Sequence, residues 1–108
     1  LLELPTIYLQ DGKKIIHSAA LNPNPQVVNY CLEMGANVNS LTRYRFTPLH
    51  FAARSSPAVV RCLIDTHRAD PNVTNSLGYD GFEWAVRANQ IECAAIMLPR
   101  YNTIINYY

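Results

Sequence analysis

The chain has 108 residues, 49% of them hydrophobic and 16% charged, which is enough for one small domain with a packed core. Nine basic and eight acidic side chains nearly cancel, so the net charge favours neither a nucleic acid nor a membrane surface as the partner. No apolar run approaches the roughly 20 residues of a membrane span, and the first residues lack the charged start and apolar core of a signal peptide.

Local start signals predict three pairs of helices. Thr47 precedes Pro48, a polar N-cap followed by the residue type that suits the first helical position. Asp80 and Glu83 have the spacing of a capping box, in which each side chain accepts a hydrogen bond from the other residue's backbone N–H. The second helices have N-cap signals at Asn24, Ser56 and Asn89. We therefore expect helices to begin near Lys14, Pro25, Pro48, Pro57, Gly81 and Gln90.

A seven-residue pattern occurs three times at one fixed spacing. The central copy is residues 47–53, Thr-Pro-Leu-His-Phe-Ala-Ala, and its echoes are residues 14–20 and 80–86. A fixed period of this length, about 33 residues, marks stacked units, each too small to bury its own apolar face. The pattern resembles the Thr-Pro-Leu-His-x-Ala motif of ankyrin repeats, and residues 32–39 and 63–72 resemble the Gly-Ala-Asp-x-Asn segment that closes such a repeat.

This resemblance implies an all-α fold, an ankyrin-repeat solenoid of about three helix-turn-helix units with protruding loop tips. We expect residues 1–108 to form a single domain, with units at about 11–43, 44–76 and 77–108. Residues 1–10 are interpreted as the remnant of a preceding unit or as an N-terminal cap. Repeat arrays normally end in polar caps, so the apolar ends of this chain indicate that further repeats, these tails or other proteins cover the stack.

The middle unit departs from the pattern twice. Its inner turn is one residue shorter, with nine steps from His50 to Val59 against ten from His17 to Val27. The segment after its second helix, residues 65–70, is then one residue longer than its counterpart, so the period survives. The extra residue is either a tolerated irregularity of the surface or a bulge that contacts a partner.

Small residues at one repeat position should let the two helices of a unit approach closely; these are Ala19, Ala52 and Ala85. We expect the continuous core to comprise Ile16, Leu49, Phe82, Val27, Val28, Val59, Val60, Leu32, Leu63 and Ile96. The three cysteines, Cys31, Cys62 and Cys93, lie in apolar helical stretches. They are interpreted as buried small hydrophobic residues of a reducing compartment rather than as metal or redox groups.

No arrangement of residues predicts catalysis. The family resemblance implies that His17 and His50 are structural and bond the neighbouring backbone, with Glu83 in their place in the third unit. The sequence has no glycine-rich phosphate loop and no nucleophile with a plausible base, and His67 has no cysteine or acidic residue at ligand spacing. We therefore expect no enzyme activity, no cofactor, no metal site and no small-molecule ligand.

The resemblance also implies that the first helices and the loop tips line one concave groove. Aromatic and arginine side chains dominate interface hot spots, and both types occur at the groove positions. The competing interpretation is that Phe51 and Trp84 only pack between repeats. The candidate partner-binding residues are Arg43, Tyr44, Arg45, Phe51, Arg54, Tyr79, Trp84 and Arg87.

Three functions fit these features. The first is a non-catalytic protein–protein interaction module, a scaffold or adaptor whose groove holds a partner protein that is apolar with acidic flanks. The second is a structural subunit or fragment wedged by its apolar ends into a larger assembly. The third is a regulatory ankyrin domain of a longer enzyme. In each case we expect an intracellular protein, cytoplasmic or nuclear, with neither nucleic acid nor membrane as its partner.

Overall fold

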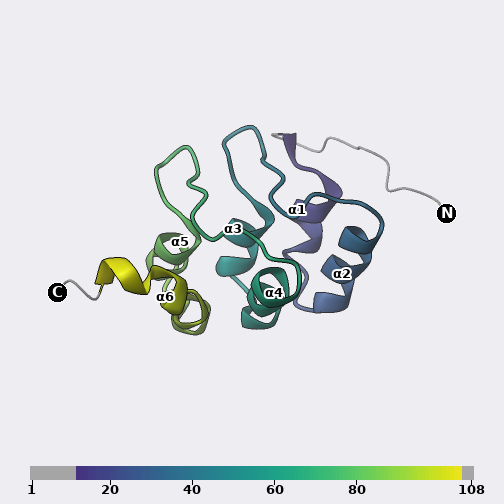
Figure 1. Cartoon of the computed structure of the whole chain (residues 1–108). Helices are drawn as coiled ribbons and strands as arrows, with labels where there is room; N and C mark the ends of the chain where they lie inside the picture. Colours follow the sequence, from purple (N-terminus) through teal and green to yellow (C-terminus); the bar gives the residue numbers. More distant parts are fainter. Residues whose placement is uncertain (1–11, 106–108) are drawn as a thin grey trace.

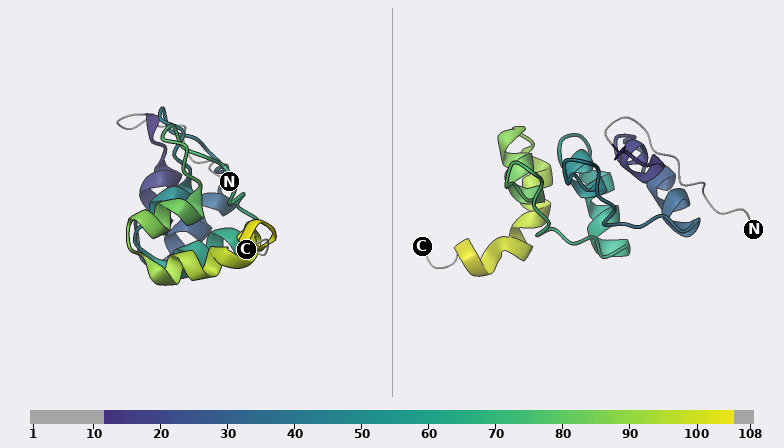
Figure 2. Two further views of the ribbon diagram at one scale, coloured as in Figure 1. Left: turned by 90° about the vertical axis from the view of Figure 1, so that its left-hand side faces the viewer. Right: turned by 90° about the horizontal axis from the view of Figure 1, so that it is seen from above.

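The helices lie in two rows, and long loops project beside one of them. The computed structural model describes residues 12–105, and the side chains of residues 12–98. Figure 1 shows α1, α3 and α5 in the row nearer the loops and α2, α4 and α6 in the other row, while Figure 2 shows the three helix pairs side by side. The elements are α1 (Ile15–Ala19), α2 (Pro25–Glu33), α3 (Pro48–Ala53), α4 (Pro57–Arg61), the π-helix η2 (Cys62–Thr66), α5 (Gly81–Arg87) and α6 (Ile91–Ile105). The predicted all-helical solenoid is confirmed, and the residues that the structure describes form no strand.

The predicted helix starts are correct to within one residue, because the caps that mark them are present. Asn24 Oδ1 accepts from Gln26 N at 3.0 Å, and Ser56 Oγ accepts from Val59 N at 3.3 Å. The capping box of the third unit is also confirmed, with Asp80 and Glu83 exchanging bonds of 2.9 and 3.3 Å. The expected cap of the last helix was wrong: Asn89 adopts a left-handed φ of 59° in the turn, and α6 begins two residues later. Local hydrogen bonding thus explains most of the helix boundaries.

The projecting loops are repeats of one turn. Gly12, Arg45 and Gly78 have φ values of 72°, 67° and 87°, and each lies one repeat period from the next. In the second loop Arg45 N donates to Thr42 O at 3.0 Å, and in the third Gly78 N donates to Asn75 O at 2.9 Å. The left-handed residue reverses the chain at the same point of each loop. The loop tips therefore have the same period as the helices.

The extra residue of the middle unit is absorbed by a widened helical turn. Five residues after α4 form the π-helix η2, a geometry that accommodates one more residue than an α-helical turn. Arg68 then falls at the position that Gly35 has in the first unit, and both are left-handed, with φ of 58° and 103°. The bulge faces the first unit, because His67 Nε2 lies 2.6 Å from Asn29 Oδ1 and Cys62 Sγ lies 3.1 Å from the same oxygen. These contacts support the interpretation of a structural irregularity, and a partner contact there stays a prediction.

Arg68→Gly should raise the free energy of unfolding by about 0.5–1 kcal/mol. A left-handed conformation costs an L-residue about 1–2 kcal/mol, and the greater freedom of glycine in the unfolded chain offsets part of the gain. Denaturant unfolding of the two proteins measures the difference. The reverse change supplies the control: Gly35→Ala should lower stability by about 1 kcal/mol, since an added Cβ meets no atom within 4 Å and acts only through φ. If each of the two variants is as stable as the unchanged protein, this account is contradicted.

The core runs continuously between the units. All three alanines of the helix contact are buried, and so are the three cysteines, which are free thiols whose pKa values are raised by burial. Leu32 and Phe82 are only half-buried, and Val27 was wrongly assigned to the core, because it is 36% exposed. Its counterparts Val59 and Cys93, also third in their helices, are fully buried, and Cys93 Sγ lies 3.9 Å from Ala52 O of the preceding unit. Val27 is on the first described unit, where no preceding helix pair is described.

Candidate functional site

Four aromatic side chains form a row beside the loops. We call Phe46, Phe51, Tyr79 and Trp84 the aromatic row. The Phe46 ring lies 5.1 Å from Trp84, edge to face, and 5.8 Å from Phe51, and Tyr79 lies 6.0 Å from Trp84. These centroid separations are typical of favourable aromatic pairs. The row therefore connects α3, α5 and two loops into one surface.

Two repeat positions supply most of this surface. One position holds Ser18, Phe51 and Trp84, and the other holds Lys13, Phe46 and Tyr79, each one repeat period apart. Phe46 was expected from the sequence as a loop-tip residue of the groove, whereas Lys13 was not predicted. Extending the same period to the loop residue before each cap would have found Lys13.

Arginine side chains lie over the row at its α5 end. Arg54 Cζ is 5.9 Å from the centroid of Trp84, and Arg87 Cζ is 4.6 Å from that of Tyr79. Both arginines are exposed, while Trp84 and Tyr79 are half-buried. Contact with the rings holds the guanidinium groups by cation–π attraction while leaving their N–H donors available.

The loop end of the row has a second pair of cations. Lys13 Nζ lies 5.2 Å from the Phe51 centroid, and Arg43 Cζ lies 5.7 Å from that of Tyr44 at the loop tip. Of the predicted candidates, Phe51, Arg54, Tyr79, Trp84 and Arg87 are thus brought together. Tyr44 lines a hollow together with Phe51, and Arg43 lies over the Tyr44 ring. Arg45 is exposed beside them, with its side chain in no ring contact of the described residues.

Two hollows open on this surface. A hollow of about 220 Å³ is lined by Arg54, Trp84, Arg87 and Ala88. A smaller one of about 170 Å³ is lined by Lys13, Thr42, Tyr44, Phe46 and Phe51. Phe51 and Trp84 are half-buried, and each packs against the Phe46 ring and also lines a hollow. Packing between repeats and availability for contact are therefore compatible for both residues.

The charge near the first hollow is positive. Asp80 and Glu83, the nearest acidic residues along the chain, are hydrogen-bonded to each other's backbone in the capping box. Within the part of the chain that the structure describes, no carboxylate forms an ion pair with Arg54 or Arg87. The two guanidinium groups thus present unneutralised charge to the groove.

The two buried histidines hold the loops in place, as the resemblance implied. His17 Nε2 lies 2.8 Å from Ser40 O, and its Nδ1 accepts from Lys14 N at 2.8 Å. His50 Nε2 lies 2.8 Å from Tyr79 O, and its Nδ1 accepts from Thr47 N. Since Nδ1 accepts, Nε2 carries the proton and donates to the carbonyl. Burial lowers the pKa of both rings, which keeps them neutral in these roles.

The described residues contain no group of three or more histidine, cysteine, aspartate or glutamate side chains that could hold a metal ion. Among the helices of residues 12–105, none is both long and apolar enough to cross a membrane.

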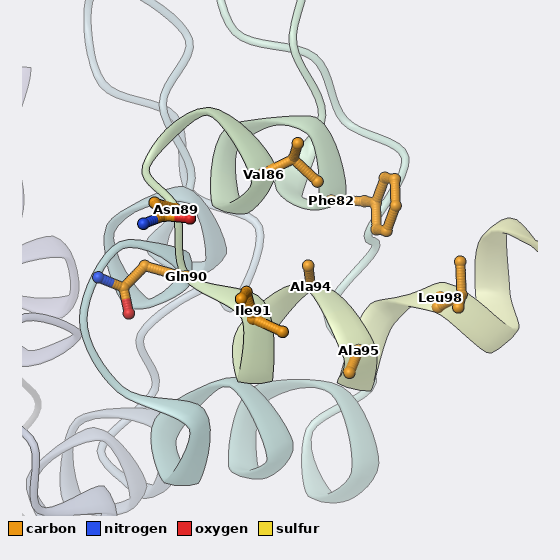
Figure 3. A pocket seen from close by; sticks show the side chains of 8 residues that line it. All are labelled: Phe82, Val86, Asn89, Gln90, Ile91, Ala94, Ala95 and Leu98. Carbon is orange, nitrogen blue, oxygen red and sulfur yellow. The ribbon is translucent and has the colours of Figure 1, made fainter.

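A separate apolar hollow lies at the α6 end of the stack, and Figure 3 shows the side chains that line it. Its volume is about 360 Å³. We call Phe82, Val86, Ile91, Ala94 and Leu98 the end face; Ala95 and the polar side chains of Asn89 and Gln90 complete the lining. None of the lining residues is charged, so the end face offers an apolar contact.

The repeat register shows what the end face corresponds to in the other units. Val86 has the same repeat position as Ala53, which is fully buried, yet Val86 itself is 55% exposed. Ala94, fourth in α6, matches Val60, fourth in α4, which is also fully buried. Helices α3 and α4 pack against the following helices α5 and α6. The end face is therefore the surface that the next helix pair covers in the preceding unit.

The side chains at the end face also differ in size from their counterparts. Val86 is larger than the alanine at its repeat position, and Ala94 is smaller than the valine at its own. The end face thus has a ridge on α5 and a hollow on α6. A helix pair that places a bulky side chain over Ala94 therefore fits this face better than a copy of the units already present does.

The chain matches the family model described as ankyrin repeats (3 copies) over residues 16–107. It is similar to the tyrosine-protein kinase Shark of Drosophila melanogaster, with 31% identity over 90 residues that cover 82% of this chain and 10% of the kinase. It is also similar to the putative palmitoyltransferase ZDHHC13 of Danio rerio (29% over 92 residues, 84% of this chain and 14% of that protein) and to the nuclear factor NF-kappa-B p105 subunit of Gallus gallus (28% over 86 residues, 77% and 9%). The chain thus spans no more than 14% of the length of these relatives. The motif, the stacked helix pairs and this match together show that the chain belongs to the ankyrin repeat family.

Proposed function

We propose that this protein is a non-catalytic interaction module that binds a partner protein along the aromatic row and its arginines. Ankyrin repeats are protein-interaction modules, and these relatives are multidomain proteins. The observation that carries the proposal is the hollow between Arg54, Trp84 and Arg87, where the large half-buried indole ring meets guanidinium groups that have no carboxylate partner among the described residues. Interface hot spots are enriched in these residue types.

The partner surface is proposed to be apolar with acidic flanks. The rings of the aromatic row would bury apolar area, while the exposed arginines would pair with carboxylates in forked geometry. The three buried free thiols suit a reducing compartment, so the proposed location is intracellular, cytoplasmic or nuclear. Neither nucleic acid nor a membrane is part of the proposal, since the chain is near neutral overall.

Charge reversal in the groove tests this function. A partner would be isolated with the tagged chain, and its affinity for purified variants would then be measured at several salt concentrations. We expect Arg54→Glu and Arg87→Glu each to weaken binding by at least tenfold and to flatten its salt dependence, because each replaces an attraction by a like-charge repulsion. Arg61→Glu on α4 is the matched control, since Arg61 is also exposed but lies on the other row of helices. Unchanged affinity in both groove variants would overturn the proposal.

A second function, a structural subunit of a larger assembly, is favoured by the end face alone. Its occupant would be a helical unit that stacks as α5 and α6 stack on the preceding pair and that places a bulky apolar side chain over Ala94. Leu77 extends this surface to the loops: it is 63% exposed and lies one repeat period after Tyr44, whose carbonyl accepts from Ser76 N at 2.9 Å. In the third loop, Leu77 thus occupies the position through which Tyr44, in the second loop, bonds the loop that follows it.

Site-specific photo-crosslinking in cells separates the two functions. A photoreactive residue in place of Arg54 should capture the partner if the groove binds it, whereas one in place of Val86 should capture a helical neighbour if the end face is the contact. Both positions are exposed, so neither change should disturb the core. Crosslinks only from Val86 would favour the structural subunit, and crosslinks only from Arg54 would exclude it.

A further inference from the structure

The Arg54–Trp84–Arg87 hollow has two features that define the chemistry of a ligand group. Its walls are one indole ring and two guanidinium groups, with the small Ala88 completing the lining. Both guanidinium groups rest on aromatic rings, Arg54 on Trp84 and Arg87 on Tyr79, so their positions are restrained before any ligand arrives. A restrained pair of fork-shaped donors loses less freedom on binding an anion than two free side chains do.

The number of charges favours a dianion over a single carboxylate. One carboxylate can pair in forked geometry with one arginine, which would leave the second guanidinium group unpaired. A phosphate monoester carries about −1.5 to −2 charge at pH 7 and three acceptor oxygens, which match two guanidinium groups. Glu83 lies one helical turn before Arg87, but its carboxylate accepts from Asp80 N, and Arg87 lies against Tyr79 instead. Glu83 therefore weakens the positive field there without neutralising either arginine.

The aromatic wall favours a phosphate attached to a ring. Trp84 is half-buried and lines the hollow, so an aromatic group entering it would contact a π face or edge. We propose that this hollow is a subsite for a phosphorylated tyrosine of the partner protein, with the phosphate between Arg54 and Arg87 and the ring against Trp84. The inference rests on the proposed function, because it assigns a ligand group to one part of the same groove.

Trp84 is the only tryptophan of the chain, so its fluorescence reports on the subsite directly. Three probes are compared. Phenyl phosphate is a dianion attached to a ring, inorganic phosphate is the anion without a ring, and benzoate is a carboxylate attached to a ring. We expect phenyl phosphate to change the Trp84 emission saturably at millimolar concentrations, and benzoate and inorganic phosphate to bind about tenfold more weakly. Calorimetry on the same solutions detects binding that leaves the emission unchanged.

Variants of the two arginines assign the site. Arg54→Gln and Arg87→Gln should each weaken phenyl phosphate binding by about tenfold, whereas Arg61→Gln should leave it unchanged. Glu83→Gln should strengthen it about twofold or more, because glutamine keeps the capping-box acceptor and removes the negative charge. Equal binding of benzoate and phenyl phosphate, equal affinities in all the arginine variants, or no binding by either method would overturn the phosphotyrosine subsite.

The partner assay distinguishes this inference from the proposed function. If phenyl phosphate does not bind but Arg54→Glu still weakens the partner complex, the groove function stands and the phosphate subsite is wrong. If phenyl phosphate binds but partner affinity is unaffected by the groove variants and by phosphatase treatment of the partner, the site does not serve partner recognition, and both proposals fail.

Discussion

His50→Ala should lower the free energy of unfolding by about 3 kcal/mol, because removal of the ring would leave a cavity and the buried Thr47 N–H without its acceptor. The Tyr79 carbonyl would lose one of its two donors and keep Asn75 N. The imidazole is buried, its Nδ1 accepts from Thr47 N, and its Nε2 donates to Tyr79 O across 2.8 Å. The cavity and the lost hydrogen bonds are each destabilising, so their costs combine. Denaturant unfolding of the two proteins measures the loss.

Glu83 occupies the same repeat position in the third unit and supplies a matched control. It is half-buried and its carboxylate accepts from Asp80 N, so Glu83→Ala removes a capping contact without opening a buried cavity. We expect that variant to cost about 1 kcal/mol. Similar losses for the two variants would show that His50 also acts only as a local cap and does not hold the loop that carries Tyr79.

The same histidines should make the fold sensitive to acid. Burial lowers the pKa of His17 and His50, so the folded state binds fewer protons than the unfolded chain once the pH approaches their ordinary value of 6.5. The stability that the neutral rings contribute is thus fully present above that pH and is lost as the pH falls below it. Melting measured between about pH 8 and pH 5 should show this decline, and replacing both histidines by glutamine should make it shallower.

The fold was predictable where the determinants are local. Thr47, Ser56 and Asp80 cap their helices with their own side chains, so residue type and spacing were enough to place the helix starts. Asn89 was misassigned because its residue type suits a cap and a left-handed turn equally, and the turn is what forms. Val27 was misplaced because its burial depends on a neighbouring unit rather than on its own helix.

Features that depend on contacts between units could be foreseen only in part. The extra residue of the middle unit was countable in the sequence, but the π-helix that absorbs it and the bonds from His67 and Cys62 to Asn29 depend on packing against α2. For the candidate site, the residue types of the groove were identified from the repeat register. Their pairing, such as Arg87 with Tyr79 rather than with the glutamate one turn earlier, required the three-dimensional arrangement.

Trp84→Ala should weaken partner binding by at least about 2 kcal/mol, which is roughly 30-fold in affinity. The indole joins the aromatic row to the Arg54 side of the hollow, so its removal would take away both the ring wall and the support of that guanidinium group. Titration calorimetry or an equivalent direct binding measurement with the isolated partner tests this expectation. Because Trp84 also packs edge to face on Phe46, we expect a loss of about 1–2 kcal/mol in stability, so affinity must be measured where the variant is fully folded.

Phe82→Ala separates the two effects of the tryptophan change. Phe82 is a half-buried aromatic residue on the same helix, but it lines the end face and not the groove. Its removal should therefore lower stability by a similar amount while leaving the affinity for a groove partner intact. If Phe82→Ala weakens binding as much as Trp84→Ala does, the loss follows from a loosened third unit or from contact at the end face. Only a selective loss with Trp84→Ala supports recognition by the aromatic row.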